Sequence, residues 1–424
     1  MTATRFVAQP LGFLEGMWKR HGDLFSVKYP FFDRVVYVAD PAGVKEIFTG
    51  DPARLHAGAG VVEMIGPIVG EQSLLTLDGP AHLEHRRLLL PPFHGERIER
   101  YREVMTRAAE KEVEDWPVGK PFALRPAMRR ITLEVILRAV FGVREEEQLA
   151  RFREVIPRLG AAGNAIVWVR GLRRDLGRFS PWGRFLRLRD RMDALLYDEI
   201  RERRADPDVA SRDDVLSLLV AARHEDGSPM SDVELRDELM TVLAAGHETT
   251  ATALAWVFER VLRHPAVDER MRESVASGAD GDEYLDAVVK ETLRVRPVVA
   301  DVVRKLTADT EIKGHLLPAG TYVVPAMAVV HLRPDVYPEP HRFRPERFLD
   351  DAAVEPYTWI PFGGGVRRCI GASFAQFEIK TVLRALVSRV RLRAASSRPE
   401  VPRASNVTVV PSRGCRVVVE ERLG

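Results

Sequence analysis

The stretch "PFGGGVRRCIGASFA", residues 361–375, carries a cysteine through a glycine-rich, positively charged loop to the start of an expected helix. A thiol becomes a ligand or a nucleophile only as the thiolate, which a helix N-terminus and nearby cations favour. Arg367, Arg368 and a helix beginning near Gly371 supply both features around Cys369. A lone cysteine is otherwise a small buried apolar residue in most proteins. The setting therefore favours a ligand or nucleophile at this position.

The glycines of this loop remove side chains, so a flat cofactor could lie against the backbone. The second cysteine, Cys415, lacks such a setting and is expected to be buried packing. Two cysteines cannot make a disulfide framework, so we expect a reducing cytoplasm.

The whole chain of 424 residues is long enough for one large domain or two smaller ones. Its 63 basic and 61 acidic side chains give a net charge of +2, which argues against binding of a bulk polyanion such as nucleic acid. No apolar run has the length of a membrane span, and the first residues lack the apolar core of a signal peptide. These features predict a soluble, cytoplasmic protein.

Helical periodicity dominates residues 96–295, where apolar residues recur three and four apart. A strand pair is expected over 24–39, followed by a helix that begins at Pro41. Ser180 followed by Pro181 marks another helix start. Short strands are expected over 302–325 and 406–421, the latter around a glycine-containing turn. The chain is therefore expected to be mainly α with a small, scattered β component.

The most informative helix is expected over 231–264, from an S-x-x-E capping box to the proline that follows it. Its length is roughly 50 Å, enough to cross a domain. Gly246 lies mid-helix, where glycine costs about 1 kcal/mol relative to alanine, and the polar residues 247–250 follow it. We expect a locally unwound functional turn here, with a solvated helix face as the alternative.

Two further motifs place charges one turn apart. Glu291 and Arg294 in "ETLR" can pair on a helix, and Arg347 in "FRPERF" offers a third member. Such a pair is important only if it is buried. His82 and Arg86 in "HLEHRR" lie on one helix face, where they would bind carboxylates or coat a surface.

Together these pieces resemble the cytochrome P-450 superfamily of haem-thiolate monooxygenases. The signature F-x-x-G-x-R-x-C-x-G matches from Phe362 to Gly371, and the E-x-x-R pair and the P-E-R-F motif are present. The oxygen-activating motif A-G-x-[DE]-T-[TS] matches from Ala245 to Thr250. The four motifs occur in the family's order, and the resemblance covers nearly the whole chain.

The resemblance implies a mainly α fold, a triangular prism of about a dozen helices with small β-sheets and a long central helix crossing over the haem. It implies a single catalytic domain over residues 1–424. The expected β-rich parts are 24–40, 300–330 and 400–420, and the expected helical parts are 78–297 and 370–390.

The implied cofactor is haem b, iron protoporphyrin IX, bound through the axial thiolate of Cys369, which favours O–O cleavage. His82 and Arg86 would bind the propionates, and Arg367 and Arg304 would add to the neutralisation of their charge. The remaining expected haem contacts are Ala245, Pro361, Phe362, Gly363, Gly371 and Ala375.

By the same resemblance, Glu248 and Thr249 would relay protons to oxygen at the haem, and an unwound turn at Gly246 would make room for dioxygen and water. A buried triad would fix the loop behind the haem, its members being Glu291, Arg294 and Arg347.

The substrate is expected to be a hydrophobic small molecule, such as a terpenoid, fatty acid or steroid-like compound, that is hydroxylated or epoxidised. The expected pocket residues come from the loop 58–70, the long helix and two later segments; they are Val61, Val62, Ile65, Ile68, Leu243, Val298, Val299, Val407 and Thr408. Ordinary core packing is the alternative for each aliphatic residue. Asp301 would be a polar handle, or would pair with a neighbouring arginine.

The resemblance to soluble bacterial members implies electron supply by a ferredoxin or flavodoxin with its NAD(P)H-dependent reductase, and we expect a monomer. Arg367, Arg368 and Lys380 would steer an acidic partner, although a solvated surface accounts equally well for Lys380. The alternative functions are a peroxide-driven peroxygenase, whose members typically lack the acid–threonine pair, and a non-catalytic haem-binding protein. A zinc module is a poor fit, because Cys369 has no second ligand at zinc spacing.

Overall fold

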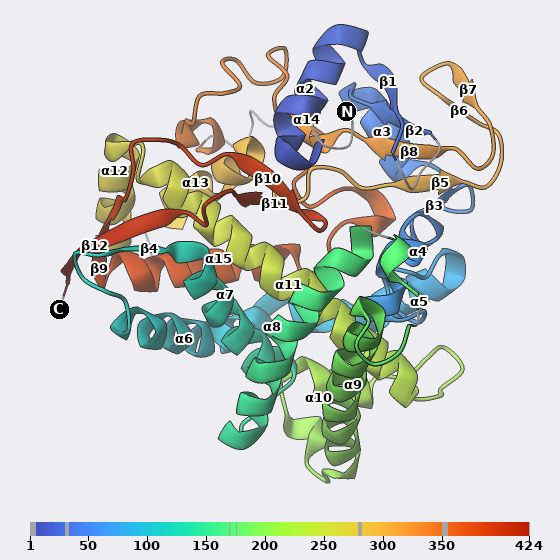
Figure 1. Ribbon diagram of the computed structural model, residues 1–424, viewed down its shortest axis with the longest axis horizontal. Coiled ribbons are helices and arrows are strands. Elements are labelled where there is room, and N and C mark those ends of the chain that lie inside the picture. Colours follow the sequence, from blue (N-terminus) through green and yellow to red (C-terminus); the bar gives the residue numbers. More distant parts are fainter. Residues whose placement is uncertain are drawn as a thin grey trace. The chain divides into compact units, whose positions relative to one another are not determined.

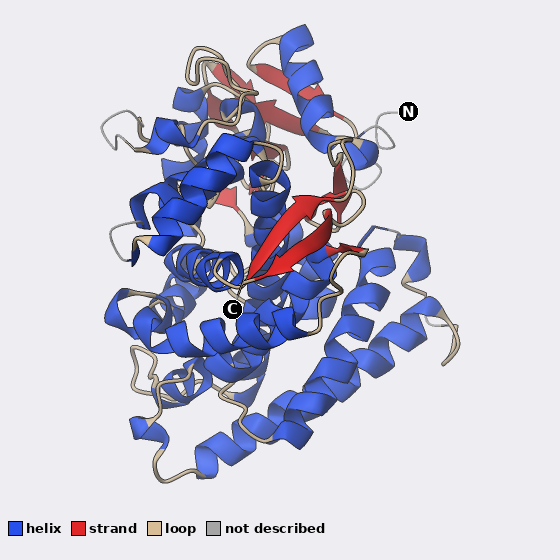
Figure 2. Ribbon diagram, turned by 90° about the vertical axis from the view of Figure 1, so that its left-hand side faces the viewer, coloured by secondary structure: helices blue, strands red, loops and turns tan. Residues whose placement is uncertain are grey.

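The computed structural model describes residues 6–29, 34–168, 170–174, 176–278, 282–349 and 355–423. Helices make up most of these residues, and the strands form small sheets, as predicted (Figure 2). The chain divides into two compact units, whose elements Figure 1 labels. Unit 1 comprises Met1–His56, Met105–Thr132 and Glu248–Gly424, and unit 2 comprises Ala57–Val104 and Leu133–His247. The single catalytic domain stays a prediction.

Unit 1 contains a five-stranded sheet in which the predicted strand pair is confirmed. Phe25 and Tyr37 face each other across the antiparallel pair, with their rings stacked at 5.2 Å. The strand order is β1 (Leu24–Val27), β2 (Val35–Val38), β8 (Tyr322–Pro325), β5 (Arg304–Leu306) and β3 (Leu55–His56). The helices α2 (Pro10–His21) and α14 (Met327–Val330) pack against it through Leu14 and Val329.

The strands predicted over 406–421 exist, but they do not pair with each other. The strand β11 (Thr408–Pro411) pairs with β10 (Pro402–Ser405), whereas β12 (Arg416–Arg422) lies between β4 (Pro121–Ala123) and β9 (Val390–Ala394). The carbonyl groups of Gly414 and Cys415 accept hydrogen bonds from the backbone of residues 124–125. The turn between β11 and β12 therefore holds the start of the helix α7 (Leu124–Val135).

The helix α3 (Pro41–Thr49) begins at Pro41, where the sequence predicts a helix start. In α3 the carboxylate of Asp40 accepts a hydrogen bond from Gly43 N at 2.8 Å, with Pro41 as the first residue. The hairpin β6 (Thr310–Ile312) and β7 (His315–Leu317) completes the predicted strands of 302–325. The other helices of unit 1 are α6 (Arg102–Glu114), α7 (Leu124–Val135), α12 (Pro265–Ala276), α13 (Asp282–Val295) and α15 (Ala372–Val387).

Unit 2 is built from helices, and one prediction made for it from the sequence is wrong. Residues 58–70, expected to be a loop, form the helix α4, because the carboxylate of Asp78 accepts hydrogen bonds from Gly58 N and Ala59 N at 2.9 and 2.7 Å and caps it. The predicted helix start at Ser180 is confirmed, since its hydroxyl accepts from Gly183 N. The helices are α4 (Gly58–Val69), α5 (Gly79–Leu89), α8 (Glu146–Trp168), α9 (Pro181–Ala205) and α10 (Val215–Ala221), with a π-helical turn over Ile136–Val140.

The long helix α11 (Asp232–Val261) contributes residues to both units and confirms the predicted capping box. Glu234 N donates to the Ser231 hydroxyl, and Ser231 N donates to the Glu234 carboxylate at 2.7 Å. The expected unwinding at Gly246 is wrong, because the helix is continuous there. A Cβ at Gly246 would lie 3.1 Å from Ile136 Cδ1, so glycine instead permits close packing against the π-helical turn.

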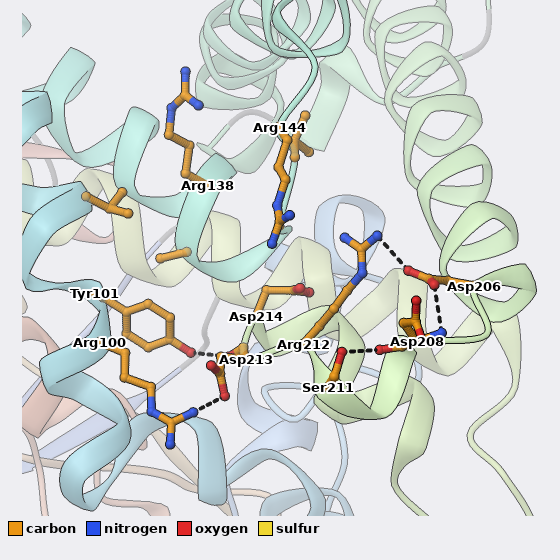
Figure 3. Close-up of a pocket in the computed structure, with 14 residues that line it drawn as sticks. Arg100, Tyr101, Arg138, Arg144, Asp206, Asp208, Ser211, Arg212, Asp213 and Asp214 are labelled. Atoms are coloured by element: carbon orange, nitrogen blue, oxygen red, sulfur yellow. Dashed lines mark hydrogen bonds and ion pairs between the residues drawn. The ribbon is translucent and has the colours of Figure 1, made fainter.

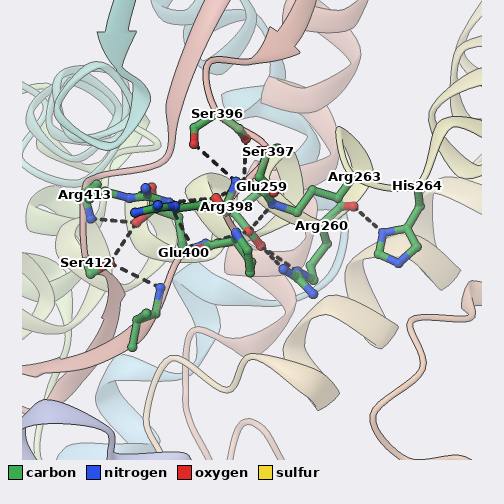
Figure 4. Close-up of polar contacts among 12 residues, drawn as sticks. Glu259, Arg260, Arg263, His264, Ser396, Ser397, Arg398, Glu400, Ser412 and Arg413 are labelled. Atoms are coloured by element: carbon green, nitrogen blue, oxygen red, sulfur yellow. Dashed lines mark hydrogen bonds and ion pairs between the residues drawn. The ribbon is translucent and has the colours of Figure 1, made fainter.

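The C-terminal end of α11 is tied to the last part of the chain by a polar cluster (Figure 4). The Glu259 carboxylate accepts from Arg263 Nε at 2.7 Å and from Glu400 N at 3.1 Å. The Glu400 carboxylate in turn accepts from Arg413 N at 2.6 Å.

Among the described residues, no helix has the combination of length and apolar character that a bilayer crossing needs.

Candidate active site

The cysteine loop of unit 1 leaves Cys369 accessible, directly before α15. Cys369 N donates a hydrogen bond to Phe362 O at 2.9 Å, and Arg368 N donates to Gly365 O, so the loop is closed by its own backbone. The Cys369 thiol is exposed, whereas Cys415 is buried, and burial raises the pKa of the Cys415 thiol well above its usual value. The two cysteines therefore differ in the way expected of one ligand and one packing residue.

The glycines of the loop serve two different purposes. A Cβ at Gly365, whose φ is +62°, would overlap the carbonyl oxygen of Phe48 in α3. A Cβ at Gly364 would lie 2.8 Å from the Tyr357 ring and 3.0 Å from the Phe48 ring. These two positions are therefore fixed by packing. At Gly371 an added Cβ would meet no protein atom within 4 Å. Glycine there is not required by the surrounding protein, and a bare backbone suits a flat group beside Cys369.

The predicted charged triad lies together in the interior of unit 1. Arg294 donates from Nε and Nη2 to the two Glu291 carboxylate oxygens at 2.7 and 2.8 Å, and both side chains are fully buried. Arg347 Nε lies 3.5 Å from Glu291 Oε1. The backbone N–H of Arg344 also donates to Glu291. A bidentate, fully buried pair is important for stability, because removal of either partner would leave a buried charge without compensation.

A histidine that sequence analysis missed connects this triad to the cysteine loop. Arg294 Nη1 donates to His331 O at 2.7 Å, and His331 Nε2 accepts from Ile360 N at 2.9 Å, directly before the loop. Burial, helped by the charge of Arg294, lowers the pKa of His331 to about 3. The ring is therefore neutral at neutral pH and can accept this hydrogen bond. A single histidine in "HLRP" gave no signal of this role.

The acid of the predicted proton relay, Glu248, is held by two arginines of α7. Arg125 pairs with one carboxylate oxygen, and Arg129 Nε lies 2.8 Å from the other. Burial lowers the pKa of Arg125 below its usual value. Arg125 Nε also donates to the Thr252 hydroxyl at 3.3 Å. Neither arginine was identified from the sequence, because more than a hundred residues separate them from Glu248.

The exposure of α11 changes at the motif that contains Glu248 and Thr249. Ala244 and Ala245 are exposed and Thr249 is half-buried, whereas residues 251–259 are all buried. Leu243, predicted to contact substrate, is buried in unit 2. The helix therefore presents a short accessible segment at the position the sequence predicts.

The predicted propionate ligands are distributed over both units. His82 is buried and Arg86 half-buried on α5 of unit 2. In unit 1, Arg304 is buried on β5, with its guanidinium 5.8 Å from the Phe48 ring centroid, and Arg367 is half-buried in the cysteine loop.

His85, on the same helix as His82 and Arg86, connects α5 to the start of α11 within unit 2. His85 Nδ1 lies 2.8 Å from Glu238 Oε1, and His85 Nε2 lies 3.4 Å from Glu234 Oε1. His224 Nε2 is 3.5 Å from the same Glu234 oxygen, and its Nδ1 is 3.0 Å from Glu84. The helix that carries His82 and Arg86 is thus held by a chain of alternating imidazoles and carboxylates.

The predicted substrate contacts have different environments. In unit 1, Val298 O accepts from Val409 N at 2.7 Å, which places Val298 beside the β11 strand that contains the buried Thr408. Val299 packs in an apolar cluster with Phe48 and Ile360, and Val407 is exposed. The four candidates in unit 2 are half-buried on α4; they are Val61, Val62, Ile65 and Ile68.

Two polar candidates are already engaged within unit 1. Asp301 accepts a hydrogen bond from Tyr37 at 2.9 Å, so its partner is a tyrosine rather than an arginine. Burial raises the pKa of Asp301 above its usual value. Lys380 lies 3.3 Å from Asp286, so its charge is compensated.

A cavity of about 580 Å³ in unit 2 contains none of the predicted site residues (Figure 3). It is lined mainly by charged side chains that pair with one another. Arg212 lies 2.6 Å from Asp206, Arg100 pairs with Asp213, and the Tyr101 hydroxyl donates to Asp213 O. This balance of charges favours a structural role for the cavity.

Comparison with known proteins identifies the family. The Cytochrome P450 family model matches residues 6–418. Cytochrome P450 135B1 of Mycobacterium bovis is 45% identical over 420 residues, covering 96% of this chain and 87% of the relative. Cytochrome P450 138 of Mycobacterium tuberculosis is 38% identical over 405 residues, covering 95% and 90%.

The structural comparisons agree. Cyanobacterial CYP120A1 with bound retinoic acid matches with a TM-score of 0.85 and 25% identity, covering 97% of this chain and 94% of that one. The haem domain of cytochrome P450DA matches with a TM-score of 0.84 and 25% identity, covering 97% and 93%. The family consists of oxidoreductases that hold haem through a cysteine thiolate. The chain belongs to the cytochrome P450 family and is a haem monooxygenase.

Proposed function

We propose that this enzyme inserts one oxygen atom into a hydrophobic small molecule, by hydroxylation or epoxidation, with electrons from a separate redox partner. The observation that carries the proposal is the polar pair Glu248–Thr249 beside the exposed Ala244–Ala245 segment of α11. A carboxylate and a hydroxyl at an otherwise apolar helix can move protons, which a monooxygenase needs and a haem carrier does not.

The cysteine loop fits the haem group. Cys369 would hold the group through its thiolate, since its thiol is accessible and the backbone beside it at Gly371 is bare. Haem bound through a thiolate supplies the oxygen-activating chemistry. The cations that would hold the propionates are His82, Arg86, Arg304 and Arg367, and the remaining contacts would be Ala245, Pro361, Phe362, Gly363 and Ala375.

Glu248 would take part in proton transfer only after its carboxylate has broken its contact with at least one of the two arginines. Its two carboxylate oxygens face Arg125 and Arg129, so each oxygen is engaged by a guanidinium group. Rotation of the side chain away from one guanidinium would free an oxygen to accept a proton from water. The protonated carboxyl would then transfer its proton to the hydroxyl of Thr249, the next residue, as that hydroxyl donates its own proton into the site.

The substrate class follows from the apolar character of the candidate contacts. The half-buried aliphatic residues of α4 and the buried Leu243 and Val298 offer shape rather than charge. A terpenoid, fatty acid or steroid-like compound would suit them. The structural neighbour CYP120A1 holds retinoic acid, a lipophilic acid, which supports this class. A spin-shift titration with a panel of lipophilic compounds tests it, and binding of polar compounds alone would contradict it.

The electron source separates the monooxygenase from a peroxygenase. We expect turnover with NAD(P)H and a ferredoxin or flavodoxin system, and little product with peroxide alone. Two cysteines without a disulfide fit a reducing compartment such as the cytoplasm, where these partners are found. Efficient turnover by peroxide without redox partners would overturn the assignment.

The role of Thr249 is tested by coupling. Thr249→Ala should bind substrate normally but release peroxide instead of product, because the hydroxyl that delivers the proton is lost. Product, peroxide and NAD(P)H consumption are measured together. Thr249→Ser keeps the hydroxyl and should remain coupled; unchanged coupling in Thr249→Ala would remove this residue from the relay.

A further inference from the structure

The carboxylate of Asp78 caps the helix α4 from the far end of the loop that follows this helix. Asp78 Oδ1 accepts a hydrogen bond from Gly58 N at 2.9 Å, and Oδ2 accepts from Ala59 N at 2.7 Å, so both oxygens are engaged. Ala57, directly before α4, has no side-chain oxygen with which to cap the helix. The first turn of α4 therefore depends on a residue that lies 20 positions after Gly58.

The sequence of α4 is a poor helix former. Its 12 residues include three glycines, one proline and five β-branched residues, all of which lower helix propensity. Pro67 has no N–H group, so the carbonyl oxygen of Glu63 lacks its usual helical donor. Arg173 Nη1 donates to this oxygen, and Arg173 Nη2 donates to Met64 O at 3.3 Å. Hydrogen bonds from outside the helix therefore help to keep α4 formed.

Asp78 is also the residue at which α5 begins. Its backbone is extended, and its carbonyl oxygen accepts a hydrogen bond from His82 N at 3.5 Å. A Cβ at Gly58 would overlap Thr76 O, so the start of α4 packs directly against the backbone that leads into Asp78. One residue therefore joins the two helices, because its side chain holds the start of α4 and its backbone begins α5.

The two helices carry different parts of the proposed site. The half-buried aliphatic residues assigned to substrate lie on α4, whereas His82 and Arg86, assigned to the haem propionates, lie on α5. The later part of α5 is fixed to α11, because His85 Nδ1 lies 2.8 Å from Glu238 Oε1. The start of α5 is held by the contact of Asp78 with α4. A change in the order of α4 would therefore reach His82 through Asp78.

We propose that Asp78 is a positioning residue that couples the order of α4 to the hold of α5 on haem. When α4 is formed, its first two N–H groups fix the carboxylate, and the start of α5 with it. When α4 frays, Asp78 loses both partners and the first turn of α5 is less well fixed. A substrate that orders α4 would accordingly slow the loss of haem, and haem would in turn strengthen substrate binding. The inference rests on the proposed function, which assigns substrate to α4 and the propionates to α5.

The coupling is tested by loosening α4 at Glu63, which is exposed and is not one of the predicted contacts. Glu63→Gly and Glu63→Ala both remove the side chain, but glycine lowers the helix propensity by about 1 kcal/mol relative to alanine. The rate at which haem passes from the haem-loaded protein to excess apomyoglobin is measured. We expect Glu63→Gly to lose haem at least about twofold faster than Glu63→Ala.

Removal of the Asp78 carboxylate should abolish this difference. In the Asp78→Ala background, haem loss should be faster than in the wild type, and the two Glu63 variants should lose haem at equal rates, because α4 no longer acts on α5. Hydrogen–deuterium exchange of the first turn of α5 in the haem-loaded proteins should follow the same pattern, which a general loss of stability would not produce. Asp78→Asn, which keeps one acceptor oxygen, should give an intermediate result.

Asp40→Ala is the matched control, since Asp40 caps α3 through Gly43 N at 2.8 Å and α3 carries none of the predicted contacts. In this background Glu63→Gly should still lose haem faster than Glu63→Ala. Equal rates for the two Glu63 variants in otherwise wild-type protein, or an undiminished difference in the Asp78→Ala background, would overturn the coupling and leave the proposed function intact. Wild-type protein that takes up no haem would contradict the proposed function and the coupling with it.

Discussion

At the scale of single residues, Arg294 shows how a buried charge is accommodated. Its guanidinium is fully buried, and it donates to both oxygens of Glu291 and to the carbonyl oxygen of His331. Removing one member of a buried ion pair leaves the other unpaired in a low-dielectric interior. The pair is therefore intolerant of single substitutions.

Arg294→Ala should lower the free energy of unfolding by about 3–5 kcal/mol, because Glu291 would be left charged and buried. Little haem-loaded protein should be recovered, since His331 and the cysteine loop lose their support. Urea unfolding and the ratio of haem to protein absorbance measure the two effects.

The matched control is an exposed pair of similar length. Arg151 lies 2.6 Å from Glu147, but the two side chains are 57% and 80% exposed. Arg151→Ala should change the unfolding free energy by less than about 1 kcal/mol. Normal yields of haem-loaded Arg294→Ala would show that the buried pair does not support the loop.

At the scale of elements, the contact between α5 and α11 should respond to pH. Burial alone would lower the pKa of His85, but Glu238 and Glu234 raise it overall, and burial raises the pKa of Glu238. A group with a raised folded-state pKa binds its proton more tightly in the native state. Its stabilising contribution is complete below the unfolded value and is lost as the pH rises through the folded value.

We therefore expect the free energy of unfolding to fall as the pH rises above about 6.5, the ordinary pKa of histidine. His85→Gln should show a smaller fall, whereas His94→Gln, at an exposed histidine, should behave like the wild type. Urea unfolding at a series of pH values measures this; identical pH profiles for all three proteins would exclude His85 as the cause.

The packing of α11 against the π-helical turn can be tested by a double-mutant cycle. Gly246→Ala adds about 1 kcal/mol of helix propensity, but its Cβ crowds Ile136 Cδ1. Ile136→Val removes that atom. Gly246→Ala should therefore be more stabilising, by about 0.5 kcal/mol or more, in the Ile136→Val background than in the wild type. Equal effects in the two backgrounds would show that the contact does not explain the glycine.

Helix starts were predictable because their signals are local. Pro41, Ser180 and Ser231 mark the starts of three helices, as the sequence indicates. The helical state of 58–70 was missed, because its cap, Asp78, lies twenty residues later. The pairing of β12 was also missed, because its neighbours come from distant parts of the sequence.

At the scale of the whole molecule, the buried cysteine reports unfolding. Cys415 is 2% exposed and burial raises its pKa, so it should be alkylated only when the protein unfolds. In haem-free protein, Cys369 should react much faster. Mass spectrometry of iodoacetamide-labelled peptides over time distinguishes the two. Labelling of Cys415 as fast as that of Cys369 under native conditions would contradict the burial.

The site could be predicted in its motifs but not in its connections. Cys369, Glu291, Arg294 and Thr249 belong to patterns within a few residues. Their partners, among them Arg125, Arg129 and His331, join the site only through the fold. Local patterns identify which side chains carry chemistry, whereas long-range packing determines what holds them in place.

The middle position of β12 in its sheet has a consequence for synthesis on the ribosome. β4 is translated almost three hundred residues before β12. In the sheet formed by the described residues, β12 is the only strand that pairs with β4. Until β12 is made, the edge of β4 is open in the nascent chain, and unit 1 cannot close. A premature stop codon ahead of residue 416 would leave both β4 and β9 without their shared neighbour. Such nonsense mutants should be degraded rather than accumulate as shortened enzyme.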